Sequence, residues 1–374
     1  MYQKDVKLNN ENKIFSKIYK IEETFTISEI CKLVDMTFPT VKRVFYNFLQ
    51  KDIIKEFRMS KSSVGRRAVE YIFNSDFCFL IGTKIYDDHQ TIILTNARGK
   101  IIKSSVFENI ENNLLDFLTE NLISFLDELS VGIRERILGI GIAIPGIYNK
   151  EDNFIELSLT KTYSGNIKQE LEEKLGYKIF IENEANLSVL AEAVLGKYGE
   201  LKDFTVISIN ENLNSSNFLK MSGQNEEFFF KASRTEHMIL DKKSGDTYGN
   251  HISFKSLEKN INKQLNCGEK ISVDDFFRRD DLLNSEKGRL VLDDFVDHLA
   301  LLIKNVIFLY NPSKIIICGL VANYEILILE KLKNKIYTDN NLFYRGKETL
   351  CFSEFRGNSS IVGAAIFPLV DSMM

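Results

Sequence analysis

The sequence predicts an α/β protein that carries a small helical module at its N-terminus. After residue 76, runs rich in β-branched residues alternate with segments of helical spacing, a pattern typical of an α/β body. Before residue 76, apolar residues recur three times at helical spacing, and two alternating runs follow. The charge is divided in the same way: residues 1–75 carry 14 Lys and Arg against 9 Asp and Glu, and the remainder carries 34 against 43. A basic segment on an acidic body indicates a module that meets a polyanion.

Length and composition exclude several classes of protein. A chain of 374 residues is long enough for two or three domains, and 44% hydrophobic with 27% charged residues is ordinary for a soluble protein. No window approaches the roughly 18 apolar residues of a membrane span, and MYQKDVKLNNENK has no signal-peptide core. The cysteines are scattered and without CxxC spacing, which favours reduced thiols in a cytoplasmic protein without membrane contact: Cys31, Cys78, Cys267, Cys318 and Cys351.

The first two predicted helices are short and amphipathic. Residues 11–21, ENKIFSKIYKI, place four apolar side chains at helical spacing: Ile14, Phe15, Ile18 and Ile21. TISEICKLV follows, in which Thr26 and Glu29 have the spacing of a capping box. Its expected apolar face is Ile30, Leu33 and Val34.

A third helix is predicted within TFPTVKRVFYNFLQKDII. Thr37 can cap it, and Pro39 is tolerated in a first turn because its missing N–H would be unpaired there. One stripe is expected to be buried, comprising Val41, Val44, Phe45, Phe48 and Leu49. The opposite face carries Phe38, Lys42, Arg43 and Tyr46. Two short helices, the second with outward basic residues near its start, are typical of a helix-turn-helix that enters the DNA major groove.

A β-hairpin wing is predicted after these helices, within IIKEFRMSKSSVGRRAVEYIF. Gly65, Arg66 and Arg67 at its tip suit phosphates or a narrow minor groove. The expected contacts to bases come from Phe38, Thr40, Lys42 and Arg43. The expected partner is double-stranded DNA with a palindromic operator, bound by a homodimer or tetramer. The alternative is that three helices and a hairpin form only a packing module.

Several motifs of the chain resemble the ROK family in their order and spacing. They are ISEICKLVDMTFPTV, VGRRA, GIGIAIPG, IENEANLSVLAEA, TEHMILDKKSG, NPSKIIICGLV and IVGAA. That family comprises sugar kinases and, when a winged helix precedes the body, sugar-responsive transcriptional repressors. The resemblance implies a two-lobed, actin-like ATPase (RNase H-like) fold with ATP and sugar in the cleft. It divides the chain into a winged helix-turn-helix at 1–75, one lobe at 76–185 with a return at 355–374, and a second lobe at 186–354 that holds the ligand cleft and dimerises.

The phosphate-binding loops implied by the resemblance are altered. Counting back from Gly99 places Lys84 where the family has an aspartate and Tyr86 where it has a glycine; the alternative register through IGTK at 81–84 also lacks the acid. At the second loop, a glycine-rich segment is replaced by Asn210, Glu211, Asn212, Leu213 and Asn214. Side chains there block the approach of phosphate to the backbone, and Glu211 repels it. We therefore expect no ATP and no other cofactor.

The metal motif implied by the family is also incomplete. His237 matches the family's histidine, but the three cysteines of the zinc loop are missing and Cys267 lies beyond it. His251 is a candidate substitute ligand, although histidines without thiolates or nearby acids are more often ordinary surface or core residues. The sequence therefore predicts no metal.

The sugar-binding positions are partly kept. The resemblance places Asn183 on a sugar hydroxyl and Glu184 at the position of the catalytic aspartate, with Gly146 and His237 completing the ligand cleft. Arg234 replaces the family's glutamate, and Glu236 stands where a glycine is usual. A simpler explanation is that Asn183 and Glu184 are only favourable residues at a helix N-terminus. Because nothing nearby would hold phosphate, we do not expect Glu184 to act as a catalytic base.

The sequence thus predicts a sequence-specific transcriptional regulator. We expect it to be a repressor of carbohydrate-related genes. Its kinase-like body would be catalytically degenerate and would sense a sugar or sugar phosphate. Two alternatives stay open. One is a sugar kinase that retains ATP-dependent phosphorylation, and the other is a body that serves only as an oligomerisation or protein-partner scaffold.

Overall fold

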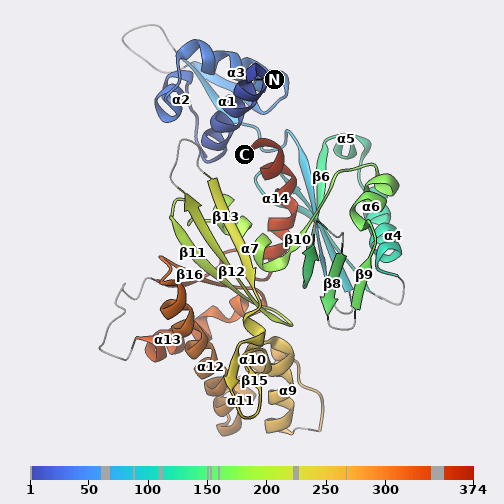
Figure 1. Cartoon of the computed structure of the whole chain (residues 1–374), viewed down its shortest axis with the longest axis vertical. Helices are drawn as coiled ribbons and strands as arrows, with labels where there is room; N and C mark the ends of the chain where they lie inside the picture. The colour runs from blue at the N-terminus through green and yellow to red at the C-terminus, as the bar shows by residue number, and fades with distance from the viewer. Residues whose placement is uncertain are drawn as a thin grey trace.

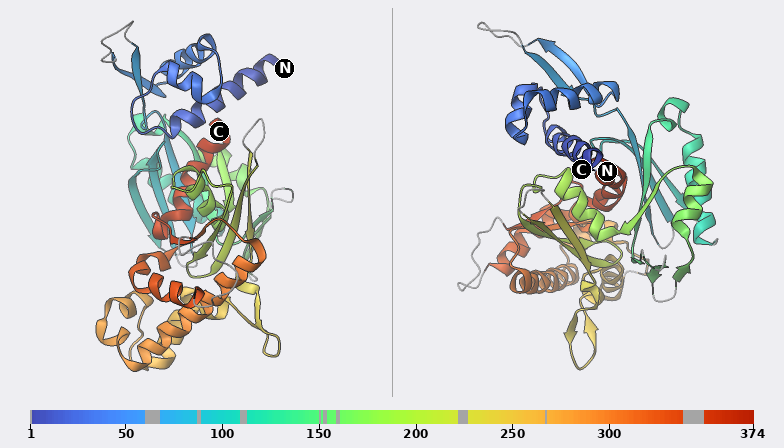
Figure 2. Two further views of the ribbon diagram at one scale, coloured as in Figure 1. Left: turned by 90° about the vertical axis from the view of Figure 1, so that its left-hand side faces the viewer. Right: turned by 45° about the horizontal axis from the view of Figure 1, so that its top comes forward.

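The computed structural model places a small helical module at one end of the chain's long axis and two β-sheets with their helices below it (Figure 1). It describes residues 2–59, 68–86, 89–108, 113–149, 151, 154–158, 161–221, 227–266, 268–337 and 349–374. The C-terminus lies beside the helical module, so the last helix returns to the start of the chain (Figures 1 and 2). No helix among the described residues is long and apolar enough to cross a membrane.

Three helices form the N-terminal module, α1 (Tyr2–Tyr19), α2 (Ile27–Val34) and α3 (Phe38–Gln50). The first helix begins well before residue 11, which corrects the expected start. The capping box of α2 is confirmed: Thr26 Oγ1 accepts from the Glu29 N–H, and the Glu29 carboxylate accepts from the Thr26 N–H. Thr37 stands at the N-cap of α3 but makes no side-chain cap bond, because its hydroxyl meets that of Thr40 instead.

The core of this module follows the predicted stripes with three exceptions, the first of which is Ile21, half-buried and beyond the end of α1. Ile14, Phe15, Ile18, Ile30, Val34, Val41, Val44, Phe45 and Phe48 are all buried. Leu49 is only half-buried, and Leu33 is 55% exposed, so its expected place on the apolar face of α2 is wrong. In an eight-residue helix, only the side chains directly above α1 and α3 are covered.

A two-stranded antiparallel sheet completes the module, from β1 (Ile54–Met59) and β2 (Val69–Phe73). Its pairing agrees with the predicted hairpin. The expected tip residues Gly65, Arg66 and Arg67 lie outside the described residues.

The first of the two larger sheets has the strand order β10-β6-β3-β4-β5. Its strands are β3 (Phe79–Ile85), β4 (His89–Asn96), β5 (Ile101–Glu108), β6 (Ile137–Ile144) and β10 (Ile179–Asn183). β3, β6 and β10 are parallel, and β4 and β5 add antiparallel strands. One face packs on α4 (Leu114–Asp127) and α6 (Ile167–Leu175), and the other packs on α14 (Ser359–Met373).

The second sheet repeats this plan, in the order β13-β12-β11-β16-β17. Its strands are β11 (Asp203–Ile209), β12 (Leu213–Met221), β13 (Glu227–Ser233), β16 (Ile315–Cys318) and β17 (Leu350–Phe352). β11, β16 and β17 are parallel, whereas β12 and β13 are antiparallel to their neighbours. In each sheet a three-stranded meander therefore continues into two parallel strands.

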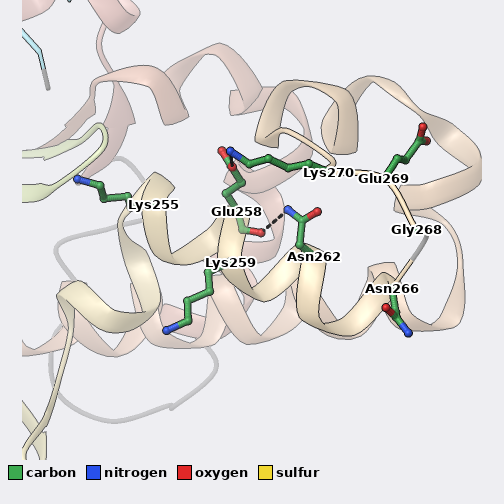
Figure 3. A pocket seen from close by; sticks show the side chains of 8 residues that line it. All are labelled: Lys255, Glu258, Lys259, Asn262, Asn266, Gly268, Glu269 and Lys270. Atoms are coloured by element: carbon green, nitrogen blue, oxygen red, sulfur yellow. Dashed lines mark hydrogen bonds and ion pairs between the residues drawn. The ribbon is translucent and has the colours of Figure 1, made fainter. Parts of the chain in front are cut away.

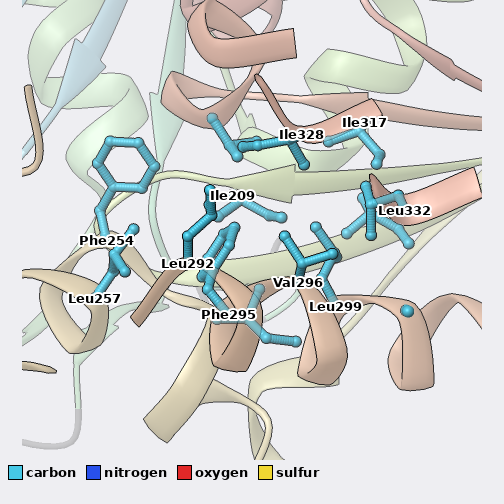
Figure 4. Close-up of a cluster of buried hydrophobic side chains, with 14 of the residues drawn as sticks. Ile209, Phe254, Leu257, Leu292, Phe295, Val296, Leu299, Ile317, Ile328 and Leu332 are labelled. Carbon is cyan, nitrogen blue, oxygen red and sulfur yellow. The ribbon is translucent and has the colours of Figure 1, made fainter. Parts of the chain in front are cut away.

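A group of helices covers the outer face of the second sheet. They are α8 (Gly249–Ile252), α9 (Phe254–Leu265), α10 (Val273–Arg278), α11 (Asp280–Leu283), α12 (Glu286–Tyr310) and α13 (Glu325–Ile336). Phe295, Val296 and Leu299 of α12 lie against Ile209 and Ile317 of the sheet (Figure 4). This core holds α8 against α12, and α8 in turn packs on the hairpin of β14 (Ile239–Asp241) and β15 (Asp246–Thr247).

Two helices fill the space between the sheets, α14 and α7 (Glu184–Val194). Glycines permit their close approach. A Cβ on Gly363 would lie 1.9 Å from the Leu187 carbonyl oxygen, and a Cβ on Gly141 of β6 would lie 1.8 Å from the Ala364 carbonyl oxygen. The IVGAA motif therefore serves backbone packing between α14, α7 and the first sheet.

The remaining elements are short and lie at the edges of the two sheets. A three-stranded sheet, in the order β7-β8-β9, follows the end of β6. The other short elements are single helical turns. These elements are β7 (Ile147–Asn149), β8 (Phe154–Ser158), β9 (Lys161–Ser164), α5 (Val131–Arg134), η1 (Thr235–His237), η2 (Leu320–Tyr324) and η3 (Arg356–Asn358).

Candidate functional site

The carboxylate at the centre of the candidate site, Glu184, forms a buried ion pair with Lys84. Lys84 Nζ lies 2.8 Å from Glu184 Oε2, and each side chain is only 2% exposed. β3 supplies Lys84 near its carboxyl end, and Glu184 opens α7 directly after the parallel strand β10. Burial lowers the pKa of the Lys84 ammonium, but the adjacent Glu184 carboxylate outweighs burial and raises that pKa above its ordinary value. The Lys84 side chain is therefore held in its charged form.

The segment at the expected second phosphate loop is a tight turn that binds Glu184. Asn214 Nδ2 donates to Glu184 Oε1 at 3.0 Å, and Asn210 Nδ2 lies 3.5 Å from Glu184 Oε2. Asn210 Oδ1 also accepts from the Leu320 N–H at 3.0 Å. Asn210 and Asn214 are both buried. The side chains that replace the glycines are thus used to fix the carboxylate and to join β11 to the segment after β16.

Little space is left at this position. A cavity of about 10 Å³ is lined by Lys84, Ile85, Tyr86, Pro145, Glu184, Asn210, Glu211 and Asn212. That volume suits about one water molecule. The Lys84 ammonium lies 4.6 Å from the centroid of the Tyr86 ring, yet Nζ has no aligned hydrogen-bond acceptor among the described residues. Because a buried ammonium costs free energy for each unsatisfied proton, an oxygen in this cavity would be well bound.

Asn183 and Gly146 are brought together as expected, but their contact is internal. Asn183 Nδ2 donates to the Gly146 carbonyl at 2.7 Å, and its Oδ1 caps α7 by accepting from the Ala185 N–H at 2.8 Å. Both the N–H donor and the oxygen acceptor of the Asn183 side chain are therefore engaged within the protein. This geometry matches the simpler explanation of Asn183 as a helix cap.

His237 lies at the border of this region without a contact to Glu184. Its side chain is 59% exposed, and Nε2 is 3.6 Å from Glu236 Oε1. Glu236 itself is largely buried, and burial raises its carboxyl pKa. Glu236 Oε2 has no hydrogen-bond partner among the described residues. A carboxyl group of raised pKa therefore stands near Glu184, at a position where the family resemblance implies a glycine.

The need of Lys84 for a buried acidic partner could have been inferred from the sequence. Within FCFLIGTKI a single lysine occupies a strand whose every described position is buried, and a lysine there requires an anionic partner. The sequence does not say which acid meets it, since Glu184 is 100 residues away and on another element.

A larger recess lies away from these residues, along α9 (Figure 3). It has a volume of about 480 Å³ and is lined by Lys255, Glu258, Lys259, Asn262, Asn266, Gly268, Glu269 and Lys270. Lys270 is paired with Glu258 at 2.6 Å, while Lys255 and Lys259 point in other directions (Figure 3). The recess is open to solvent, and because Lys270 and Glu258 are used in their own ion pair we assign no function to it.

The residues expected to contact DNA form an exposed face on α3. Phe38, Lys42 and Arg43 are exposed, and Thr40 is half-exposed at the helix start. Tyr46 extends the same face and is 64% exposed. The opposite side of α3 is buried against α1 and α2. The helix therefore offers one aromatic and basic face to solvent.

Comparison with known proteins agrees with the fold. A family model described as the ROK family matches residues 80–211 and 245–369. Among curated proteins, the xylose repressor of Caldicellulosiruptor bescii is 25% identical over 350 residues, covering 87% of this chain and 84% of that protein. The xylose repressor of Bacillus subtilis is 22% identical, covering 88% of this chain and 87% of that protein. The Escherichia coli dual regulator NagC is 20% identical, covering 87% of this chain and 84% of that protein.

Solved structures include regulators and kinases. A ROK family transcriptional regulator, described as a homologue of the E. coli MLC protein, superposes with a TM-score of 0.78 at 18% identity, covering 98% of this chain and 97% of that one. A ROK family glucokinase from Streptomyces griseus has a TM-score of 0.63 at 14% identity and covers 77% of this chain and 98% of its own. The family model spans more than half of the sequence, and the chain belongs to the ROK family.

Proposed function

We propose that this protein is a DNA-binding transcriptional repressor whose kinase-like body senses a sugar or a sugar phosphate and does not catalyse phosphoryl transfer. In this proposal the first 75 residues are a winged helix-turn-helix, followed by a lobe at 76–185 with its return at 355–374 and a second lobe at 186–354. The exposed face of α3 is the observation that carries the proposal. The names of the curated relatives, which are repressors of xylose or N-acetylglucosamine systems, support it.

DNA recognition is argued from the surface of α3. Its N-terminal turn presents Phe38 and Thr40, and the next turn presents Lys42 and Arg43. In a helix-turn-helix these positions reach base edges, while a homodimer places two such helices on the half-sites of a palindrome. Arg66 and Arg67 would add phosphate or minor-groove contacts from the wing.

The loss of kinase activity is argued from Lys84 and Glu184. A catalytic base must reach a sugar hydroxyl with a free lone pair, but Glu184 is paired with an ammonium and accepts from Asn214. The cradle for phosphate is replaced by asparagine side chains at 210 and 214 that bind the same carboxylate. We therefore expect no sugar-dependent ADP release; a clear rate would support the alternative of a retained sugar kinase.

A ligand could act on the DNA-binding module through the end of α1. Tyr19 Oη donates to the Ala97 carbonyl at 2.7 Å, and Arg98 donates to the Ile21 carbonyl at 2.6 Å. Lys20 is paired with Glu200, which follows α7. The module is thus attached to the first sheet at 97–98 and to the second-sheet side at Glu200. A ligand that binds one arrangement of the two sheets more tightly would raise the population of that arrangement. The DNA-binding module would then be moved with the sheets to which it is attached.

DNA selection at physiological salt tests the proposal. Genomic fragments bound by the wild type would be compared with those bound by Lys42→Ala/Arg43→Ala. Lys263→Ala/Lys287→Ala is the control, because it removes the same charge from exposed sites on α9 and α12. We expect a recurrent palindromic site that only the α3 variant loses, since non-specific binding weakens with salt. Equal binding by all three proteins would contradict sequence reading by α3.

Ligand sensing is tested separately, with D-xylose and N-acetylglucosamine as the probes. A ligand at 100 times its dissociation constant adds about 2.7 kcal/mol to stability, which a thermal-shift measurement detects. The sensor proposal expects one sugar to raise the Tm and to change operator affinity. If neither sugar alters the Tm or the operator affinity, the result favours the alternative that the body is a scaffold.

A further inference from the structure

A cluster of potential metal ligands lies on the outer side of the second sheet, away from Lys84 and Glu184. Its members are His251, Asp294 and His298, each of which can place one ligand atom within 4.8 Å of the others. Asp294 and His298 are four residues apart on α12, so they share one face of that helix. His251 comes from α8, which packs against α12. Such a set, two imidazoles and one carboxylate, is the donor set that proteins use for Zn²⁺ and similar divalent ions.

The segment that carries His251 is fixed in place. Tyr248, directly before α8, is 1% exposed, and its hydroxyl accepts from Asn305 of α12 at 2.6 Å. His251 and His298 then meet as stacked rings, with centroids 3.9 Å apart and planes inclined by 16°.

Hydrogen bonds leave one nitrogen of each ring available. His298 Nδ1 lies 2.8 Å from the Asp294 carbonyl and 3.4 Å from Asp294 Oδ1. A neutral ring that donates from Nδ1 to that carbonyl keeps its lone pair on Nε2. His251 Nε2 lies 2.6 Å from Asp246 Oδ2, and a proton shared with this carboxylate leaves the lone pair on Nδ1.

Asp246 is itself oriented as a supporting group. Its Oδ1 accepts from Asn250 Nδ2 at 2.8 Å and from the Thr247 N–H at 3.0 Å. A carboxylate that holds the far nitrogen of a histidine is the usual arrangement behind a metal-bound imidazole. The cluster therefore has both ligands and a support for one of them.

We propose that His251, Asp294 and His298 bind a divalent transition metal ion, with Zn²⁺ as the probe ion, and that Asp246 positions His251. The ion would take its ligands in the ring planes, so one imidazole turns out of the stack on binding. The side chains of His251 and His298 are 26% and 24% exposed, which leaves room for this turn and for water as a fourth ligand. The site joins the β14–β15 hairpin and α8 to α12.

This site differs from the zinc loop implied by the family resemblance. That loop would use His237, which is present, and three cysteines, which this sequence lacks. The proposed site instead takes two of its three ligands from α12. It also departs from the expectation that the chain holds no metal. His251, considered only as a lone substitute in the sequence, gains two partners that are 43 and 47 residues away.

Metal titration of the untagged full-length protein tests the proposal. After chelator treatment and dialysis, Zn²⁺ binding would be followed by calorimetry, and Co²⁺ by its visible absorption. We expect one equivalent per chain and a higher Tm with metal. His251→Ala and His298→Ala should each abolish the stoichiometric site, and Asp246→Asn should weaken it 10- to 100-fold.

His237→Ala is the matched control, since it removes an exposed histidine outside the cluster. It should bind Zn²⁺ as the wild type does. An unchanged far-UV spectrum and metal-free Tm would show that each variant folds. The proposal is overturned by the absence of stoichiometric binding, by binding that survives in both cluster variants, or by a loss in His237→Ala equal to theirs.

Discussion

Lys84 and Glu184, from two different elements, form an ion pair of 2.8 Å in which each side chain is 2% exposed. Removing two charges from water costs several kcal/mol per ion, and the attraction repays this only with good geometry and further hydrogen bonds. Asn214 supplies one such bond to Glu184. The pair therefore fixes the meeting of β3 and α7.

Glu184→Gln should destabilise the protein strongly, by about 3–5 kcal/mol, because it leaves the Lys84 ammonium buried without a counter-charge. The double variant Lys84→Met/Glu184→Gln should recover most of the loss, since no charge then remains to be desolvated. Denaturant unfolding of the wild type, both single variants and the double variant measures the coupling. Additive losses would show that the two charges do not stabilise each other.

Burial of Glu192 makes the free energy of unfolding depend on pH, and the direction of this dependence follows from the raised pKa. This α7 residue is 2% exposed, its Oε1 has no hydrogen-bond partner among the described residues, and burial raises its carboxyl pKa from 4.5 to about 7. Between these pH values the folded state binds more protons than the unfolded state, so this group's contribution to stability falls as pH rises. Glu192→Gln removes the effect, and its stability relative to wild type should rise by about 3 kcal/mol from pH 4.5 to above 7.

The measurement is denaturant unfolding of both proteins across that pH range, taking the difference at each pH. Other carboxyl groups titrate in the same range, but they are common to the two proteins and cancel. A difference that stays constant with pH would mean that Glu192 ionises as readily in the folded state as in the unfolded one.

Gly363→Ala should lower the free energy of unfolding by about 1–3 kcal/mol or more, which is the usual cost of overpacking a core. The new Cβ would lie 1.9 Å from the Leu187 carbonyl oxygen, a backbone atom that cannot turn away, so α14 and α7 must separate. Gly132→Ala is the control, because nothing lies within 4 Å of its Cβ position in α5; it should be neutral or gain about 0.5–1 kcal/mol. Thermal unfolding compares the two, and equal effects would contradict close packing at Gly363.

Phe48→Ala and Lys42→Ala separate the two faces of α3. Phe48 is fully buried, so its truncation should cost about 3–5 kcal/mol of stability. Lys42 is exposed, and its truncation should leave stability within about 0.5 kcal/mol. In the proposed role, Lys42→Ala alters the preference among operator sequences. A uniform loss over all sequences, measured by competitive binding, would instead identify Lys42 as a phosphate contact.

The sequence by itself determined the local structure of the chain. The capping box of Thr26 and Glu29, the buried stripe of α3 and the buried strand GIGIAIPG each depend on neighbours within a few residues. Periodicity and capping report such short-range requirements directly. Leu33 marks the limit, since helical spacing places it on the apolar face but the module has nothing to cover it.

Only the tertiary structure decided which distant side chains meet. Lys84 and Glu184, or His251 and His298, stand on separate elements whose relative placement depends on packing between sheets and helices. For the first pair, glycines at 141 and 363 bring β6, α14 and α7 together through backbone contacts that leave no periodic signal. The pairing of charges and of imidazoles is a property of the assembled core, because burial creates the need for a partner and packing alone chooses which one is in reach.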